Sequence, residues 1–440
     1  MQTNARDCAL IALERCINSG AWSGAAIDNI IKKSQLDSRD AALASRLCLG
    51  VLQNRRYCDY CIGLYYNKGT NKLEPKLLNI LRLGVYQLLF LDKIPARAAV
   101  NESVDLCKRN GFGRASGLVN AVLRRVSERS DAFPEPPGKG SAEYLSIRYS
   151  HPEELVSRII ELQGYDFTEA FLKKNNEVSK LSIQINTLKV SVEDYLRALA
   201  RKDIPYTALD GIDGCIQLEG GKVNELPGFD DGLFYVQDPA ARAVAEIADI
   251  RPGMSVLDSC SAPGGKSFAS AIKMNNIGSI LSCDIHEKKL KLIQSGAQRL
   301  GIDIISTKAR DARTDEAQLH DAFDVAIADV PCSGLGVIGK KPEIREKALD
   351  DIKSLPSIQQ EILETVSGFV KVGGTLLYST CTVLPEENEL LVESFLSAHP
   401  EYEPVEFELG GIKSRRGMYT FWPHIDNTDG FFAAKLKRKF

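Results

Sequence analysis

Short apolar runs alternate with helical or loop segments throughout the second half of the sequence, from Val236 onward. The runs are SVLDSC, SILSCD, IDIISTKA, FDVAIADV and GTLLYSTC, at residues 255–260, 279–284, 302–309, 323–330 and 374–381. Adjacent parallel strands require a crossover connection, usually a helix, so this alternation predicts a doubly wound α/β sheet. Ligands of such sheets bind outside the carboxyl ends of the strands. We therefore expect the functional residues where these runs end.

The rest of the chain shows different patterns. The first 130 residues have helical apolar spacing, which predicts an all-α module whose buried central helix lies between Pro75 and Pro95. The segment SDAFPEPPGKGS, residues 130–141, is rich in proline and glycine and is typical of a linker. After helical patterns comes one clear strand, LSIQINTLK, with Leu181, Ile183 and Ile185 on one face. The sequence therefore predicts a multidomain chain: an all-α module at residues 1–132, a linker at 133–144, a small α+β connector at 145–235 and the α/β domain at 236–440.

Length and composition restrict the class of protein. A chain of 440 residues with 44% hydrophobic content can bury a core but is too long for one ordinary domain. No stretch of about twenty uncharged apolar residues occurs and the first residues lack a signal-peptide pattern, so we expect neither a membrane nor a secreted protein. Eleven scattered cysteines fit reduced thiols in the cytoplasm better than a disulfide scaffold. Cys58 and Cys61 form a lone CxxC without further ligands nearby, so we expect packing there rather than a metal site.

Charge is distributed unevenly along the chain. The whole sequence has a net charge of −3, yet residues 1–130 contain 20 Lys or Arg against 11 Asp or Glu, a local net of +9. A basic module is typical of a protein that binds nucleic-acid phosphates. A well-solvated helical surface would show the same excess, so charge alone leaves both interpretations open.

The first apolar run of the α/β half leads into a glycine loop, SCSAPGGKS, at residues 259–267. At such a strand-to-helix turn the backbone can approach a ligand closely, and the amides at the start of the helix face it. The ending Gly265-Lys266-Ser267 resembles a phosphate-binding P-loop, but that pattern requires glycine where Cys260 stands. A nucleotide hydrolase is therefore a weak alternative, which phosphate-release assays would test. The loop also lacks the GxGxxG pattern of dinucleotide-binding proteins.

Aspartates close the next strands. Asp284 ends the second run about twenty residues after the glycines, where an acidic side chain can accept hydrogen bonds from ribose hydroxyls. Asp311, in KARDAR after the third run, is placed for contacts with the edge of an adenine. Either residue alone could be an ordinary loop or cap residue. Together with the glycine loop they predict an adenosine-containing ligand.

The last two runs end near cysteines. Asp329 and Cys332 follow the fourth run, and Cys381 ends the fifth, before a helix expected to begin at Pro385. If these strands are neighbours, both thiols reach one pocket. A thiolate can add to C6 of a pyrimidine and make C5 nucleophilic toward a methyl sulfonium; a base then removes the C5 proton and the thiol leaves. In this interpretation Asp329 holds the polar edge of the base, Lys266 lowers a thiol pKa or positions the base, and the second thiol assists release. Spacing does not assign the two thiol roles, and a cysteine is often only a small core residue.

The motifs SAPGGK, CDIHEKK, KARDAR, ADVPCSGLGVI, GGTLLYSTCTVLPEENE and DGFFAAKL closely resemble those of the RsmB (Sun/Fmu) branch of the RNA cytosine-C5 methyltransferases. The resemblance implies that S-adenosylmethionine is the cofactor. It implies that Cys381 attacks C6 and that Cys332 helps release the product. It also implies cofactor contacts at Cys260, Ser261, Ala262, Pro263, Gly264, Gly265, Lys266, Asp284, Asp311 and Asp329.

The helical module resembles the RNA-binding fold of the antitermination factor NusB, as it does in that branch. The likeness is carried by LRLGVYQLLFLDKIPARAAVNESVDLCKR and GLVNAVLRR, and it agrees with the local charge of +9. It implies a cytosine in 16S rRNA as the substrate, and we expect a cytoplasmic monomer that uses no metal. The alternatives are a methyltransferase of tRNA or large-subunit rRNA, or a non-catalytic RNA-binding or antitermination factor.

One segment departs from the family pattern. After GVI this chain has GKKPEIREKAL, where many relatives carry Arg-His-Pro and a tryptophan. Pro342, Ile344 and a basic Arg345 remain, so we expect this loop to contact RNA.

Overall fold

The computed structural model describes residues 4–128, 135–219 and 223–440. The chain forms two compact units. The helical unit comprises Met1–Glu177 and Ile338–Leu349, and the sheet unit comprises Val178–Val337 and Asp350–Phe440. Part of the predicted linker, residues 133–134, lies outside the described residues. Across the described ranges no helix is both long enough and apolar enough to cross a lipid bilayer.

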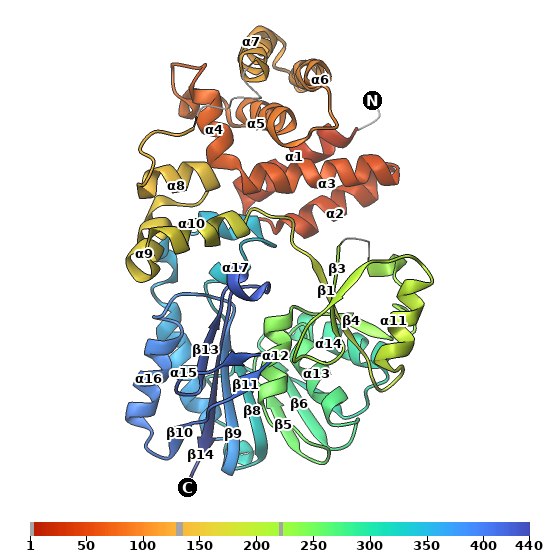
Figure 1. The fold of residues 1–440 in the computed structure, drawn as a ribbon, viewed down its shortest axis with the longest axis vertical. Coiled ribbons are helices and arrows are strands. Elements are labelled where there is room, and N and C mark those ends of the chain that lie inside the picture. Colours follow the sequence, from red (N-terminus) through yellow and green to blue (C-terminus); the bar gives the residue numbers. More distant parts are fainter. Residues whose placement is uncertain (1–3, 129–134, 220–222) are drawn as a thin grey trace. The chain divides into compact units, whose positions relative to one another are not determined.

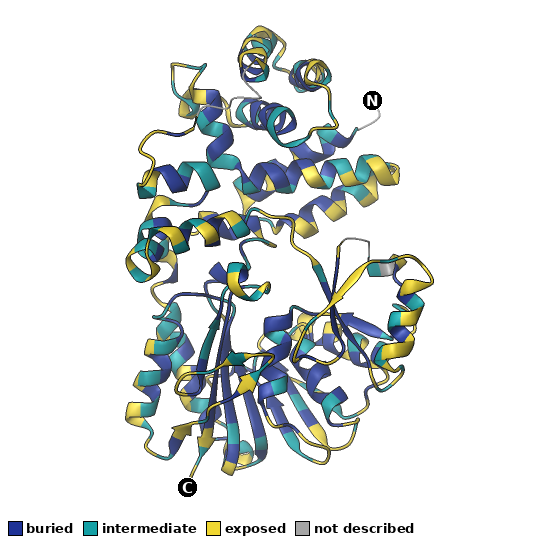
Figure 2. Ribbon diagram, in the orientation of Figure 1, coloured by how far each residue is buried: buried dark blue, intermediate teal, exposed yellow. Residues whose placement is uncertain are grey.

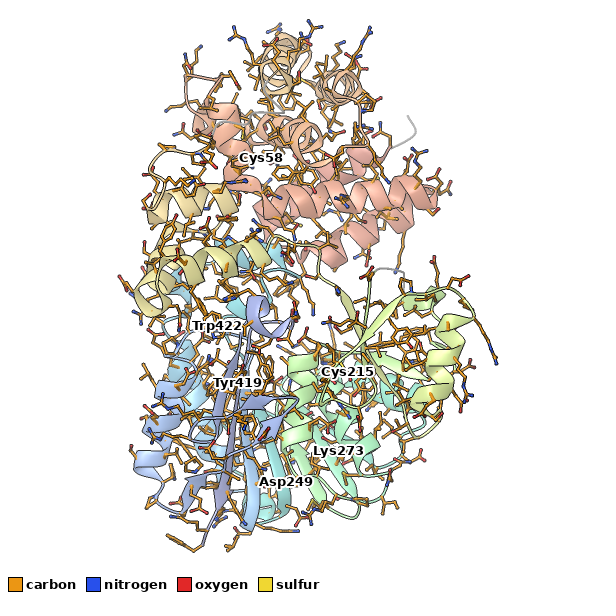
Figure 3. All side chains as sticks on the ribbon, in the orientation of Figure 1. Cys58, Cys215, Asp249, Lys273, Tyr419 and Trp422 are labelled. Atoms are coloured by element: carbon orange, nitrogen blue, oxygen red, sulfur yellow. The ribbon has the colours of Figure 1, made fainter. Side chains whose placement is uncertain are left out.

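The helical unit is built around α5 (Pro75–Phe90), the predicted central helix. Pro75 occupies its first turn, and the side chain of Glu74 accepts a hydrogen bond from the Leu77 amide at 3.0 Å. Cys58 and Cys61 lie fully buried in the same apolar core, as expected for packing residues (Cys58 is labelled in Figure 3). The other helices are α1 (Ala5–Ser19), α2 (Ser23–Ser34), α3 (Ser38–Gln53), α4 (Arg55–Gly63), α6 (Ala96–Arg109), α7 (Ser116–Ser127), α8 (Ala142–Tyr149), α9 (Glu153–Gln163) and α10 (Tyr165–Lys174), with 3₁₀ turns η1 (Thr70–Lys72), η2 (Gly113–Ala115) and η6 (Pro342–Glu346).

A distant segment of the chain, residues 338–349, belongs to the helical unit and is held there by polar contacts. The amide and hydroxyl of Ser23 donate to Glu343 at 3.0 and 2.7 Å. The guanidinium of Arg345, fully buried, donates to backbone carbonyl oxygens of Gln53, Tyr149, Ser150 and Asn175 at 2.6 to 3.3 Å.

The expectation that this loop contacts RNA stays a prediction, but the side chains of Pro342, Ile344 and Arg345 are buried. Arg345 shows no exposed surface, and its two terminal nitrogens donate to main-chain oxygens. Burial also lowers the pKa of Arg345 to about 9. These residues join the segment to the helices.

The sheet unit begins with a small antiparallel sheet in the order β2-β3-β1-β4. The predicted strand is confirmed as β1 (Leu181–Ile185), whose Ile183 and Ile185 pack against Tyr195 and Leu199 of α11 (Val192–Ala200). The remaining elements are β2 (Tyr206–Ala208), β3 (Cys215–Leu218), β4 (Phe234–Val236) and η3 (Val223–Glu225).

The compact units and the predicted domains divide the chain differently. The predicted connector, residues 145–235, is shared between them: its helices α9 and α10 and most of α8 belong to the helical unit, and its strands to the sheet unit. Helix α8 packs on α4, which explains why α8 belongs to the helical unit. The predicted domain boundaries therefore stay predictions.

The large sheet has the order β10-β14-β9-β8-β5-β6-β7. Its five strands β5 to β9 are mutually parallel. All five apolar runs form strands, which confirms the predicted doubly wound α/β domain. Beyond the prediction, β14 pairs antiparallel with β9, and β10 and β13 pair with β14. The strands are β5 (Ser255–Asp258), β6 (Ser279–Asp284), β7 (Ile305–Ala309), β8 (Phe323–Asp329), β9 (Val370–Thr380), β10 (Tyr402–Pro404), β13 (Met418–Phe421) and β14 (Phe431–Arg438), beside the small hairpin β11 (Glu408–Leu409) and β12 (Ile412–Lys413).

Helices cover both faces of the large sheet (Figure 1). Alternate strand residues face opposite ways: Val256 joins the core under α12 to α14, and Leu257 joins the core under α15 and α16. Strands β5, β6, β8, β9 and β14 are accordingly buried along most of their length, whereas the edge strand β7 is not (Figure 2). The helices are α12 (Pro239–Ile247), α13 (Gly265–Lys273), α14 (Glu287–Leu300), α15 (Leu355–Ser367), α16 (Glu389–Ala398) and α17 (Pro423–Asp426), with η4 (Ala317–Leu319), η5 (Leu335–Val337) and η7 (Leu349–Ile352).

Candidate active site

The two predicted thiols lie side by side at the carboxyl edge of the large sheet. Strands β8 and β9 are parallel neighbours, with Asp329 opposite Ser379, so the residues that follow them emerge together. The sulfur atoms of Cys332 and Cys381 are 3.1 Å apart, and the Cys381 amide donates to the Cys332 sulfur at 3.2 Å. Both cysteines are free thiols. The structure thus brings the pair together, and their separate roles stay predictions.

The surroundings of the pair favour the protonated form of Cys332. The side-chain hydrogen bond shared with Cys381 raises the pKa of Cys332 well above its ordinary value, and burial and the nearby charge of Glu387 act in the same direction. Cys332 is therefore the thiol that keeps its proton.

A buried ion pair stands at the same strand end. The amine of Lys266 lies 2.6 Å from Oδ2 of Asp329, and the Ser379 hydroxyl donates to the other carboxylate oxygen at 2.8 Å. The Lys266 amine also lies 5.0 Å from the centre of the Phe431 ring. The pair presents a donor and an acceptor beside the thiols, as needed to hold the polar edge of a flat base.

The glycine loop before α13 is shaped by close contacts. Gly264 has φ +111°, and a Cβ there would lie 2.6 Å from the Phe268 ring. A Cβ on Gly265 would lie 2.9 Å from the amide nitrogen of Gln237. The N-cap residue of α13, Gly264, has no side chain to cap the start of the helix. The Ser261 hydroxyl donates to the Cys283 carbonyl at 2.8 Å, which ties the loop to β6.

Asp258, which sequence reasoning missed, lies at the end of β5 beside this loop. It is fully buried; its Oδ2 accepts from the Ser267 hydroxyl at 2.7 Å, and its Oδ1 has no hydrogen-bond partner among the described residues. Burial raises the pKa of Asp258 to about 7. In the sequence it looks like any strand residue, and its position next to a glycine loop was the one available signal.

The other predicted ligand residues occupy different environments. Asp284 is mostly buried at the end of β6 and accepts the His286 amide at 2.8 Å. The Asp311 carboxylate is engaged by the Arg313 guanidinium at 3.1 and 2.7 Å, which lowers the pKa of Asp311. Cys260 is half-buried, and burial raises its pKa to about 12, so it is a neutral thiol. Residues 4–128, 135–219 and 223–440 contain no cluster of three metal-ligating side chains.

The helix expected to begin at Pro385 begins later. Residues 385–388 form a turn, and α16 starts at Glu389. The turn is held by buried contacts: the Tyr378 hydroxyl donates to the Glu387 carbonyl at 2.6 Å, and the side chains of Glu387 and Asn388 bond to the loops that carry the thiols.

Comparison with known proteins shows the family to which the chain belongs. Family models match three parts of the chain: the NusB family at residues 3–128, the ferredoxin-like domain of the RsmF/B methyltransferases at 151–224, and 16S rRNA methyltransferase RsmB/F at 245–437. A relative from Bacillus subtilis (strain 168), named probable ribosomal RNA small subunit methyltransferase B, is 34% identical over 100% of this chain and 99% of its own. This chain belongs to the ribosomal RNA small subunit methyltransferase B family. That family consists of S-adenosylmethionine-dependent RNA methyltransferases.

One further relative and one solved structure match nearly the whole chain, and another structure matches part of it. A Synechocystis sp. (strain ATCC 27184 / PCC 6803 / Kazusa) relative of the same name is 35% identical over 99% of both chains. The crystal structure of PH0851 superposes with a TM-score of 0.82 at 27% identity, covering 98% of each chain. A methyltransferase homolog from Pyrococcus horikoshii covers 69% of this chain at 26% identity, with a TM-score of 0.61. Membership of the methyltransferase B family thus involves both the helical module and the sheet domain.

Proposed function

We propose that this protein methylates C5 of a cytosine in 16S rRNA, with Cys381 as the attacking thiol and Cys332 as the thiol that assists release. The observation that carries the proposal is the pair of free thiols, 3.1 Å apart, at the ends of β8 and β9. They stand at the strand end that also carries the Lys266–Asp329 ion pair. Neither carbon of the C5–C6 bond of cytosine is nucleophilic by itself. A thiol at this position can add to C6 and so activate C5 for methyl transfer.

The chemistry assigns each group one task. The Cys381 thiolate forms a bond to C6, and the electron pair of the C5–C6 double bond makes C5 nucleophilic. Lys266 and Asp329 hold the polar edge of the base and stabilise the charge that develops on it. After methylation a base such as water removes the C5 proton, the S–C6 bond breaks, and its electron pair returns to Cys381. The protonated Cys332, next to the departing sulfur, stabilises it by hydrogen bonding.

S-adenosylmethionine would supply an electrophilic methyl group in this site. The residues fit such a ligand: Gly264 has a backbone conformation that L side chains rarely adopt, and a buried oxygen of Asp258 has no hydrogen-bond partner among the described residues. We assign its binding to residues 260–266 together with Asp284, Asp311 and Asp329. The amino group or ribose hydroxyls of the ligand would satisfy the carboxylates.

The helical module is proposed to bind the RNA. It matches the NusB family and carries the local net charge of +9. The target cytosine must leave any base stack to reach the thiols, because a thiolate attacks C6 from above the ring. The named relatives act on small-subunit rRNA, which supports 16S rRNA as the substrate. We propose that the protein acts as a monomer in the cytoplasm.

Mapping the methylated nucleotide tests this assignment. Purified protein is incubated with labelled S-adenosylmethionine and with 16S rRNA, 23S rRNA or tRNA from cells that lack the enzyme, and the product is digested and sequenced. We expect label as 5-methylcytosine at one position of 16S rRNA. Label in tRNA or 23S rRNA instead would support the alternative substrates. RNA binding without transfer to any of them would support a non-catalytic RNA-binding factor.

A further inference from the structure

Two adjacent polar residues in the turn after Cys381 are almost completely buried. Glu387 has 2% of its surface exposed and Asn388 has none. Burying a carboxylate or an amide is costly unless each is hydrogen-bonded. Their partners therefore show why the chain buries them at this position.

Glu387 bonds to the loop that carries Cys332. Its Oε2 accepts the Ser333 amide at 2.9 Å and the side-chain amide of Gln359 at 2.8 Å. The same Gln359 nitrogen donates to the Pro331 carbonyl at 2.9 Å. The residues on both sides of Cys332 are thus fixed by the Glu387 carboxylate and the Gln359 side-chain amide. Gln359 is also fully buried.

Asn388 makes the matching contacts to the loop that carries Cys381. Its Oδ1 accepts from the Thr380 hydroxyl at 2.6 Å, and its Nδ2 donates to the Thr382 carbonyl at 3.1 Å. The residues on both sides of Cys381 are therefore bound to a single side chain. Thr380 and Thr382 have no exposed surface, so water does not compete for these bonds.

The two loops are also bonded to each other. The Ser333 hydroxyl donates to the Thr382 hydroxyl at 2.7 Å, and the Gly336 amide donates to the Cys381 carbonyl at 3.0 Å. Adjacent residues of one turn thus hold two loops that lie 49 residues apart in the sequence. The short separation of the sulfur atoms follows from this shared support.

We propose that Glu387 and Asn388 are positioning residues with separate effects: Asn388 places the Cys381 thiol for attack, and Glu387 places the Cys332 thiol for release. The inference rests on the proposed roles of the two thiols. The proximity of the Glu387 carboxylate also helps keep Cys332 protonated. Neither residue touches the reacting atoms, so their effects are exerted through the loops.

The test compares Asn388→Ala and Glu387→Ala in methyl transfer to 16S rRNA, with denaturing gels for covalent protein–RNA complexes. Misplacing a reacting group by about 1 Å costs about 100-fold in rate. We expect Asn388→Ala to slow formation of the complex by about 10- to 100-fold without accumulation. Glu387→Ala should form the complex but release it slowly, so that the complex accumulates as turnover falls. Glu387→Gln, which keeps one acceptor oxygen, should recover part of the release rate.

Asn186→Ala is the matched control. Asn186 is fully buried in the sheet unit, and its side-chain amide donates to the Gly232 and Leu300 carbonyls at 2.9 and 2.8 Å. This variant should lose stability without changing the ratio of complex to product. The proposal is overturned if Asn388→Ala and Glu387→Ala each change formation and release of the complex equally, as the control does. It is also overturned if Asn388→Ala slows release and Glu387→Ala slows formation. Asn388→Asp and Gln359→Ala replace any variant that does not fold.

A second readout needs no RNA and separates this inference from the proposed function. Alkylation of the free protein by iodoacetamide, followed by peptide mass spectrometry, gives a rate for each thiol. Asn388→Ala should change the alkylation rate of Cys381 by about threefold or more, and Glu387→Ala should change the alkylation rate of Cys332 by about threefold or more. The change at Cys381 should be at least as large as the change at Cys332. If the wild type methylates no RNA but these rates change selectively, only the proposed function fails. Unchanged alkylation rates in both variants would refute the positioning roles.

Discussion

The amine of Lys266 lies 2.6 Å from a carboxylate oxygen of Asp329, and the lysine is almost fully buried. Lys266 comes from the first turn of α13, and Asp329 ends β8, so the ion pair joins the glycine loop to the strand that leads to Cys332. A buried lysine without its partner would be costly. In the proposed mechanism, the pair would place a fixed cation where charge develops on the base.

Replacing this lysine should reduce methyl transfer. We expect Lys266→Met to lower the single-turnover rate by about 100-fold or more, because a preorganised cation at a developing charge contributes on that scale. Lys273→Met is the control: Lys273 ends the same helix, is labelled in Figure 3, and pairs with Glu246 at 2.6 Å. An equal loss in both variants would indicate damage to α13 and not loss of a group at the base.

Asp258 should make stability depend on pH. Its pKa is raised from 3.8 to about 7, so the folded protein binds this proton more tightly than the unfolded chain. Its contribution to stability is complete below about pH 4 and is lost as pH rises through about 7. The shift corresponds to at most about 4 kcal/mol.

Asp258→Asn cannot ionise and keeps an acceptor for Ser267. Relative to wild type, its free energy of unfolding should rise between pH 4.5 and pH 8, measured by urea denaturation. Asp249→Asn, at a largely exposed carboxylate that pairs with Lys435, is the control and should show a smaller change. A constant difference between Asp258→Asn and wild type over this pH range would rule out the raised pKa.

Arg345 should stabilise the helical unit. Arg345→Ala leaves buried carbonyl oxygens of Gln53 and Asn175 without this donor, and we expect a loss of about 2 to 4 kcal/mol in unfolding free energy. Lys108→Ala removes an exposed lysine that pairs with Asp105, and it should cost less than about 1 kcal/mol. Similar small losses in both variants, measured by chemical denaturation, would contradict a structural role for Arg345.

Gly336 should tolerate no side chain. A Cβ there would lie 1.9 Å from the Gly430 carbonyl oxygen, and the Gly336 amide bonds to the Cys381 carbonyl. Gly336→Ala should therefore shift the backbone at Cys381 and lower methyl transfer by about 10-fold or more. Gly117→Ala, at a helical position with open space, should leave transfer unchanged. Normal activity of Gly336→Ala would show that this backbone contact is dispensable.

The sequence predicted the parallel strands and the meeting of Cys332 with Cys381, because apolar runs and strand ends are local features. It did not predict the burial of Arg345, since arginine is usually exposed and its carbonyl partners span residues 53–175. Glu387 and Asn388 were missed for the same reason: PEENE has the composition of an exposed helix start. Strand β14 was not predicted because its antiparallel pairing with β9 depends on tertiary contacts.

The most direct test of the two thiol roles is methyl transfer from labelled S-adenosylmethionine to undermethylated 16S rRNA by wild type, Cys381→Ala and Cys332→Ala. Denaturing gels detect covalent protein–RNA complexes, and calorimetry measures cofactor binding. We expect transfer by wild type, none by Cys381→Ala despite near-normal cofactor affinity, and accumulation of a complex with Cys332→Ala. Transfer by Cys381→Ala at the wild-type rate would contradict the assignment of Cys381 as the nucleophile.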